Sequence, residues 1–259
     1  MRTLISVIAL LAAQTPALAQ GGAAVEGLFR LEIMRPMLDE APFVGEVGGW
    51  VIMPEAIYPL GRSRARFDLP ISLGSGGGES GLHLGNPYLG IEAYTGNTTI
   101  NFGVRVPLSP IPDNPGELLA TDLALLADFE RFEAYMPKLF SALIRVSGER
   151  RSSSGLLATG HFGGVFMAST EGGDPEALLD YGAAIGVGGP RGRGTAGVDG
   201  RLVLTADGDF GERSVHFFNL RFAYSASRLR PFGLLRVPLE NDADPLNWVL
   251  GLGVELLLR

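Results

Sequence analysis

Charged residues of both signs recur at every second position in several stretches of this 259-residue chain. Arg30 and Glu32 are spaced in this way, and Arg64, Arg66 and Asp68 form a longer run. In an extended strand, residues two apart point to the same face, so each run would place its charges on one surface. Where such a surface is enclosed, the charges must pair or stay hydrated. The spacing therefore indicates electrostatic chemistry: ion pairs that brace a wall, or a charged lining that selects ions.

The same alternation along the rest of the chain predicts one enclosed, polar surface. Its candidate residues are Arg30, Arg64, Arg66, Arg105, Arg145, Arg201, Arg221, Arg230 and Arg236, together with Glu26, Glu32, Asp68, Glu92, Asp180, Asp199 and Glu255. Two interpretations stay open, a ladder of structural salt bridges and an electrostatic filter. Because both signs are present, we expect no strong preference for anions or cations.

The histidines and glycines do not have the context that catalysis or cofactor binding requires. A serine nucleophile needs a histidine base close to it, and none of His83, His161 and His216 stands in a His-x-Ser pair or in a cluster of metal ligands. We interpret His161, on the predicted inner face, and His216, on the outer face, as structural. The glycines at 186–189 precede a further strand rather than the helix of a phosphate loop. We therefore expect no catalytic residue, no metal site and no cofactor.

The last strand shows most clearly what kind of element positions these charges. In residues 247–258 every even position, from Trp248 to Leu258, is apolar, whereas the odd positions are mostly small or polar. A period of two over this length indicates a strand between two different environments. Strands of soluble proteins usually have about five or six residues. A longer strand with one unbroken apolar face is typical of a membrane-spanning barrel.

Eleven further stretches alternate in a comparable way. They are residues 24–34, 46–55, 64–73, 86–94, 98–108, 139–146, 155–168, 178–187, 195–206, 213–224 and 228–239. They predict an all-β fold, a single closed antiparallel transmembrane β-barrel of about twelve strands. Short turns at 59–61, 95–97 and 225–227 alternate with longer connections, including a Gly/Ser loop at 74–85. An even number of strands places both chain ends on the short-turn side, which in such barrels is the periplasm.

Residues 114–130 interrupt the pattern with helical signals. Asn114 is a good N-cap, Pro115 suits the first helical position and Glu117 lies three residues after the cap. Apolar residues then recur at helical spacing. We expect one short helix in an external loop, which either packs as a lid on the barrel rim or folds into the mouth as a constriction.

The chain begins with the features of an export signal. Arg2 supplies a positive charge, residues 4–13 are an apolar core, and 17–19 form a small-x-small cleavage site. We expect a cleaved signal peptide at 1–19 and one barrel domain at 20–259. No later stretch has the ~18 consecutive apolar residues of a transmembrane helix, although hydrophobic residues make up 46% of the chain.

Charge and cysteine content exclude other classes of function. A net charge of −7 argues against nucleic acid as a partner. The absence of cysteine removes disulfides, thiolate metal sites and redox centres. An exported protein without disulfides must depend on its fold alone, and a closed barrel does so by pairing every backbone group.

Two sets of residues carry a resemblance to a known class of protein. The ending Gly253-x-x-Leu256-x-Leu258 resembles the C-terminal assembly signal of Gram-negative outer-membrane barrels, although Leu258-Arg259 stands where an aromatic residue is usual. The strands at 86–94 and 100–108 resemble those of poorly characterised porin-like transporter barrels. This resemblance covers most of the chain after residue 19. It implies export to the outer membrane of a Gram-negative bacterium, contact with outer-membrane lipid, and the barrel assembly machinery as partner of the C-terminal strand.

Several classes of function remain open from the sequence. We expect a passive channel or transporter for small, apolar solutes. The alternative is a structural or anchoring barrel with a filled lumen and no transport. A lipid-modifying enzyme and a soluble secreted β protein are weaker hypotheses, because no catalytic motif is present and the apolar faces are long.

Overall fold

Fourteen antiparallel strands and one α-helix make up the computed structural model, which describes residues 27–38, 47–61, 63–189, 191–225, 228–240 and 246–258. The strands are β1 (Gly27–Leu38), β2 (Gly48–Leu60), β3 (Ser63–Asp68), β4 (Ile71–Gly76), β5 (Glu79–Leu84), β6 (Tyr88–Thr95), β7 (Thr98–Arg105), β8 (Leu139–Arg151), β9 (Leu156–Ser169), β10 (Glu176–Gly188), β11 (Gly192–Val203), β12 (Ser214–Tyr224), β13 (Leu229–Pro238) and β14 (Leu246–Leu258). The helix α2 (Pro115–Ala127) is followed by the 3₁₀ segment η1 (Phe129–Ala134).

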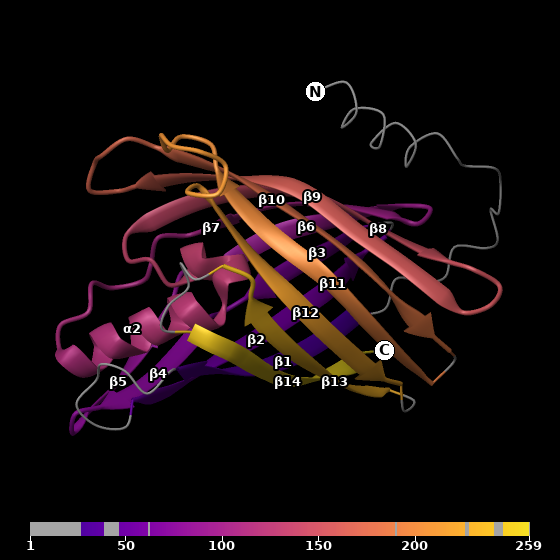
Figure 1. Ribbon diagram of the computed structural model, residues 1–259, viewed down its shortest axis with the longest axis horizontal. Coiled ribbons are helices and arrows are strands. Elements are labelled where there is room, and N and C mark those ends of the chain that lie inside the picture. Colours follow the sequence, from indigo (N-terminus) through magenta and orange to yellow (C-terminus); the bar gives the residue numbers. More distant parts are fainter. Residues whose placement is uncertain are drawn as a thin grey trace.

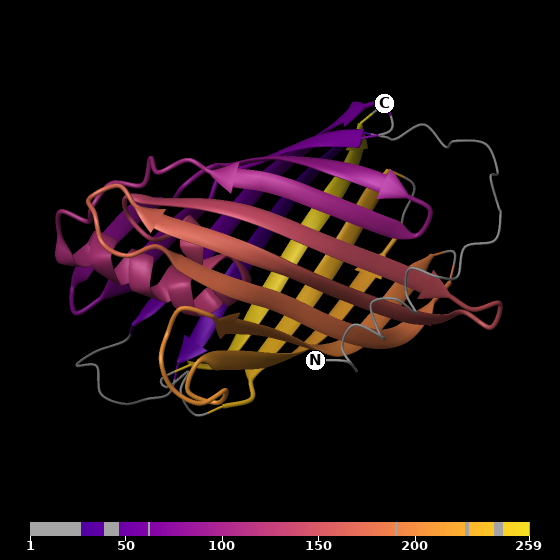
Figure 2. The ribbon, with the colours of Figure 1, turned by 90° about the horizontal axis from the view of Figure 1, so that it is seen from above.

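Twelve of the strands close into a barrel. Strand β1 pairs with β14 on one side, from Gly27 opposite Leu258, and with β2 on the other, where Leu28 lies opposite Ile57. All the other barrel strands pair with their neighbours in sequence, except that β3 pairs with β6. The strands cross the barrel obliquely (Figure 2). The predicted fold class, a closed antiparallel barrel of about twelve strands with one helix in a loop, is confirmed.

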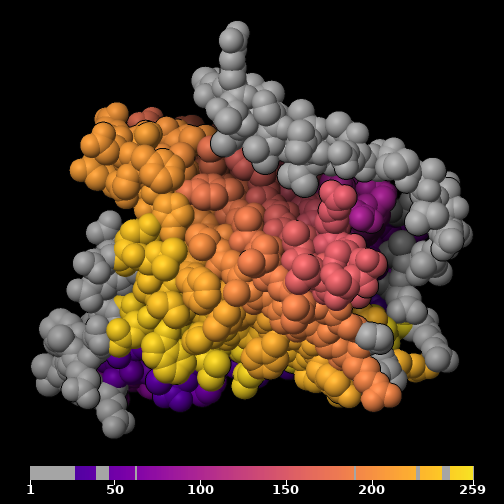
Figure 3. All heavy atoms as spheres, turned by 45° about the vertical axis from the view of Figure 1, so that its right-hand side comes forward, coloured from indigo at the N-terminus to yellow at the C-terminus, as the bar shows by residue number. Residues whose placement is uncertain are grey.

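The two faces of the wall follow the alternation of the sequence. In β14, Leu252 points outward with 54% of its surface exposed, whereas its neighbours Gly251 and Val249 are buried. In β1, Glu32 and Met34 are buried and Phe29 is exposed. The late strands, orange to yellow in Figure 3, cover the outside of the barrel with a continuous layer of side chains.

Strands β4 and β5 correct one prediction. The glycine-rich residues 74–85 were predicted to be a loop, but they lie largely in a hairpin that extends the wall beyond β2, at the end of the barrel where α2 packs (Figure 1). Only Gly77 and Gly78, with φ of 60° and 86°, form its turn. The predicted strand 64–73 is also divided into β3 and β4, with Leu69 and Pro70 between them.

The barrel has two different ends. Connections at one end are short, such as Gly96–Asn97 between β6 and β7, and the last residue of β14 lies there. The other end carries the longer connections, among them the one that contains α2 and η1. We call these the short-turn end and the long-loop end. Within the described residues, no helix is long and apolar enough to cross a membrane. The predicted signal peptide at 1–19 lies outside the described residues.

Candidate functional site: a charged vestibule and its plug

The helical segment between β7 and β8, residues 115–134, closes one half of the barrel, and we call it the plug. Its α-helix begins where the sequence predicts. The Asn114 side chain accepts a hydrogen bond of 3.0 Å from the backbone N–H of Glu117, and the Asn114 amide donates to the Glu117 carboxylate at 2.8 Å. Pro115 occupies the first turn. These contacts satisfy N–H groups that have no partner inside the helix.

Glycines let α2 approach the β4–β5 hairpin closely. A Cβ placed on Gly74 would lie 2.5 Å from the backbone nitrogen of Ala120, and one on Gly81 would overlap the backbone of Glu117. Leu123 is buried against Gly49 of β2, and Leu119 packs against Gly76. The hairpin is rich in glycine because a helix lies on it, and this is why its composition resembles that of a loop.

After α2, η1 is tied by ion pairs to strands from several parts of the wall. Glu133 Oε2 lies 2.8 Å from Arg201 Nη1 of β11, and Glu133 Oε1 lies 3.7 Å from Arg105 Nε of β7. Arg131 Nη2 lies 3.0 Å from Glu32 Oε2 of β1. Because these partners come from separate strands, η1 is fixed across the inside of the barrel.

Glu130 connects the plug to the remaining side of the wall. Its Oε1 lies 2.6 Å from Arg221 Nη2 of β12 and 3.0 Å from Arg236 Nη2 of β13. Arg236 also donates to the carbonyl of Ala127 at 3.3 Å, and Arg201 donates to the carbonyl of Glu130. The arginines therefore satisfy the backbone acceptors of the plug as well as its carboxylates.

These contacts determine which protonation state of the plug the fold favours. Burial alone would raise the pKa of Glu130, but the Arg221 and Arg236 guanidiniums hold that pKa well below its ordinary value. For Glu133, burial is likewise opposed by Arg201 and Arg105, and the pKa is lowered. Burial raises the pKa of Asp128, which Arg131 offsets only in part. The two glutamates thus bind the wall as anions.

Apolar side chains fill the space around the plug. One core cluster combines plug residues with inward-facing residues of β1, β2, β12 and β14: Met34, Val51, Met53, Ala124, Ala127, Ala134, Tyr135, Phe217, Leu246 and Val249. A second cluster, Leu139, Val165, Met167 and Leu178, packs against Phe132 of η1. The long-loop half of the barrel is consequently packed like the interior of a soluble protein.

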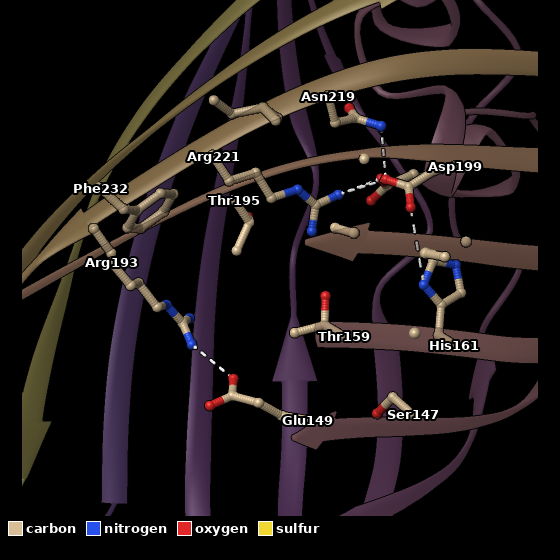
Figure 4. Close-up of a pocket in the computed structure, with 18 of the residues that line it drawn as sticks. Ser147, Glu149, Thr159, His161, Arg193, Thr195, Asp199, Asn219, Arg221 and Phe232 are labelled. Atoms are coloured by element: carbon tan, nitrogen blue, oxygen red, sulfur yellow. Dashed lines mark hydrogen bonds and ion pairs between the residues drawn. The ribbon is translucent and has the colours of Figure 1, made fainter. Parts of the chain in front are cut away.

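The short-turn half instead contains a cavity of about 510 Å³, which we call the vestibule. Seven arginines and five carboxylates line it: Arg30, Arg66, Arg131, Arg145, Arg193, Arg221, Arg236, Glu32, Glu130, Glu149, Asp199 and Glu255. The hydroxyls of Ser147, Thr159 and Thr195 and the ring of Phe232 also line the vestibule (Figure 4). Its inner end is formed by Glu130 and Arg131 of the plug.

The structure places most of the predicted lining residues in two groups. Arg30, Glu32, Arg66, Arg145, Asp199, Arg221, Arg236 and Glu255 line the vestibule. Asp68, Glu92, Arg105 and Arg201 are buried, and the Asp68 Oδ1–Arg105 Nη1 pair measures 2.8 Å. Arg64 donates to the Tyr94 hydroxyl at 3.0 Å, and Arg230 lies opposite Glu255 in the β13–β14 register. Asp180 lies 2.5 Å from Arg145, between Oδ2 and Nη2. Glu26 is outside the described residues.

Sequence reasoning missed the charges that the plug contributes. Glu130, Arg131 and Glu133 were not among the predicted lining residues, because a helix in a loop shows no inward or outward alternation. Glu55, which lies 2.8 Å from Arg66 (Oε1 to Nε), was missed because the facing of its strand was ambiguous. Glu130, at the end of the predicted segment 114–130, and Glu133, just after it, were the one available signal.

The three histidines have different surroundings. His161 lies on the inner face between two carboxylates, 3.7 Å from Asp180 and 3.9 Å from Asp199. On the outer face, His216 contacts the Tyr181 hydroxyl at 2.6 Å and the Glu240 carboxylate. His83 is buried and contacts the Ser109 hydroxyl at 2.7 Å. In the described part of the chain, no group of three or more His, Cys, Asp or Glu residues could hold a metal ion.

Known structures share this architecture. The sequence matches no family model and no curated protein. The fold is similar to that of the COG4313 outer membrane channel from Pseudomonas putida F1, with a TM-score of 0.62, 8% identity, and coverage of 95% of this chain and 100% of that one. A looser similarity is to the NanC porin, with a TM-score of 0.48, 5% identity, and coverage of 88% of this chain and 98% of that one. Another is to the translocator domain of autotransporter NalP from Neisseria meningitidis, with a TM-score of 0.47, 10% identity, and coverage of 98% of this chain and 94% of that one. The chain therefore resembles Gram-negative outer-membrane β-barrel proteins.

Proposed function

We propose that this protein is an outer-membrane channel for small solutes that its own plug holds closed. The observation that carries this proposal is the division of the lumen. A charged vestibule of about 510 Å³ occupies one half of the barrel. It ends at a segment outside the strand ladder, which is held by ion pairs to the wall and by hydrogen bonds from Asn86. A barrel needed only as a brace gains nothing from a vestibule.

The outer surface supports insertion into a membrane. Every barrel strand exposes at least one large apolar side chain, for example Phe29, Trp50, Phe67, Leu89, Phe102, Ile144, Phe166, Ile185, Val198, Phe222, Leu229 and Leu252. Soluble monomers rarely expose continuous apolar surface on this scale, whereas lipid covers it in a membrane barrel.

The proposal includes a location and an orientation in the membrane. We infer export by the signal peptide at 1–19, and insertion into the outer membrane of a Gram-negative bacterium by the barrel assembly machinery acting on the C-terminal strand. The short-turn end, and with it the vestibule, would face the periplasm. A protease site inserted at Gly96 should be protected in intact cells, and one at Gly172 should be cleaved. Cleavage at Gly96 would reverse the orientation.

The lining of the vestibule bears on the class of solute. Apolar solutes, expected from the sequence, remain a prediction. The charged and hydroxyl-bearing side chains around the vestibule favour polar solutes, because an apolar molecule would have to displace their hydration.

Loosening the plug is the direct test of this function. The double variant Glu130→Gln, Glu133→Gln keeps the side-chain volumes and removes both carboxylates that hold the plug to four arginines. We expect single-channel currents in planar bilayers to appear or to increase several-fold over the wild type. Retention of heat-modifiable gel mobility would report that the barrel is folded.

Two further variants complete the experiment. The control is Glu149→Gln, which removes a vestibule carboxylate that does not contact the plug and should leave the conductance near that of the wild type. A deletion of residues 116–134, bridged by a Gly/Ser linker, tests the same point if the double variant does not fold. A folded deletion variant with unchanged conductance would refute the proposal.

A structural barrel with a filled lumen is the second candidate. It is favoured by the nearly complete burial of the Glu133–Arg201 pair, whose side chains are only 2% and 4% exposed. This function would be supported if the wild type, the double variant and the deletion variant all fold and none conducts.

A further inference from the structure

The strand-borne part of the vestibule is electropositive, in contrast to the chain as a whole. The wall contributes six arginines and only four carboxylates to the lining, whereas the chain carries a net charge of −7. The plug adds the carboxylate of Glu130 and the guanidinium of Arg131 at the inner end. Arg145 and Arg66 are paired with Asp180 and Glu55 of the wall, so the attraction of anions depends on the more exposed arginines, Arg193 and Arg221.

Glu130 occupies the best anion site of this wall. Its Oε1 accepts a hydrogen bond from Arg221 at 2.6 Å and forms an ion pair with Arg236 at 3.0 Å. Charge-assisted hydrogen bonds to two guanidiniums are the contacts that a carboxylate or phosphate ligand would seek. A carboxylate attached to the plug thus makes the contacts that a free anion would make.

Arg221 can be reached from the vestibule without prior movement of the plug. Its side chain is 49% exposed, and it lines the vestibule together with Thr195 and Phe232 (Figure 4). The Arg30 guanidinium lies 4.4 Å from the centroid of the Phe232 ring. The guanidinium covers a face of that ring, and the ring also lines the chamber, which therefore offers a cation for an acid group and ring carbons for an apolar group. Its volume is in the usual range for small-molecule sites.

We propose that the vestibule binds small organic anions, which carry a carboxylate or phosphate and an apolar part, and that the bound anion competes with Glu130 for Arg221 and so loosens the plug. This inference rests on the proposed channel function and names its solute class. In the closed barrel Glu130 acts as a tethered competitor. Arg221 also pairs with Asp199 of β11, at 2.9 Å between Nη2 and Oδ2, so an anion that binds at Arg221 competes with both carboxylates, and by linkage the release of the plug must strengthen anion binding.

Competition makes a prediction that simple attraction of anions does not. Benzoate serves as the probe, and binding to the purified full chain in detergent is measured by calorimetry. Glu130→Gln should bind benzoate about fivefold tighter or more, as expected when a coupled competitor is removed. Arg221→Gln should bind about tenfold more weakly or worse, because a charge-assisted hydrogen bond is lost.

The controls separate the site from its general charge. Glu149→Gln removes the same charge from the same chamber, but Glu149 pairs with Arg193 rather than Arg221, at 3.4 Å between Oε2 and Nη1. Benzyl alcohol, the neutral counterpart of benzoate, should not bind. Equal gains in Glu130→Gln and Glu149→Gln, wild-type affinity in Arg221→Gln, or binding of benzyl alcohol equal to that of benzoate would each overturn the inference.

A second measurement does not depend on the folding of the Glu130 variant. The chain has no cysteine, and Ala134 of the plug is completely buried, so a single Ala134→Cys substitution reports plug release. Benzoate, but not benzyl alcohol, should speed its labelling by a water-soluble thiol reagent, and an unchanged rate would show that the anion does not loosen the plug. Because neither measurement uses current, a barrel that binds benzoate in this way but never conducts would refute the channel function alone.

Discussion

The two halves of this barrel are built from the same strands, yet they have different interiors. In the long-loop half, inward-facing residues such as Met34, Met53 and Val249 pack against the plug and are almost fully buried. In the short-turn half of the same strands, Arg30 and Glu255 line the vestibule. The strand pattern is common to both halves, so the difference comes from a segment that lies outside the strands.

The charges illustrate the same contrast. Around the plug, carboxylates and guanidiniums are withdrawn from water and must be paired, because an isolated buried charge is very unfavourable. In the vestibule, Arg193 and Glu149 are 54% and 41% exposed and can exchange their partner for water. An ion pair in the first region holds the structure together, whereas the exposed pair in the second contributes little to stability.

The strongest way to break this comparison is to remove one carboxylate from each half. Glu133→Gln leaves Arg201 and Arg105 without their shared anion in a buried site, and we expect a loss of about 3–5 kcal/mol in the free energy of unfolding. Glu149→Gln removes an exposed pair and should cost about 0–1 kcal/mol. Urea unfolding of the detergent-folded protein measures both. Similar losses in the two variants would mean that the halves do not differ in burial.

A smaller effect is expected where the plug meets the extended hairpin. Gly74→Ala places a methyl group 2.5 Å from the backbone of Ala120, so α2 must move away, at a cost of about 1–3 kcal/mol. Gly48→Ala, in the neighbouring strand β2, has nothing within 4 Å of its new methyl group. It should change stability by less than about 0.5 kcal/mol. The same unfolding measurement tests this pair, and an equal response would argue against close packing of α2.

The smallest effect concerns pH. Because the folded-state pKa of Glu133 is lowered from its ordinary value of 4.5, its contribution to stability is fully present above that pH and disappears as the pH falls through the lower, folded-state pKa. The stability advantage of the wild type over Glu133→Gln should therefore be constant near neutral pH and decrease in acid. Comparison of the two proteins cancels the opposite contribution of Asp128, whose pKa burial raises. An advantage that grows below pH 4.5 would contradict the assigned ion pairs.

Predictions from the sequence succeeded where the signal is local. The alternation in β14 is visible in the letters because successive residues of a strand face opposite sides, and the barrel confirms it. The cap at Asn114 is equally local, since its partner Glu117 is only three residues away. The glycine-rich hairpin was predicted wrongly because its glycines serve a helix that follows it by about forty residues, a contact that no local pattern records.

The repeating strands, their apolar and polar faces, and the helix that interrupts them can be predicted from the sequence, because each depends on residues within a few positions of one another. The filling of one half of the barrel and the cavity in the other cannot be predicted in this way. That outcome depends on Glu130 and Glu133 meeting Arg221, Arg236, Arg201 and Arg105, which are up to 106 positions away along the chain. Charges so distant in sequence become partners only once the wall has closed and the plug has entered it, since burial is what makes their pairing obligatory.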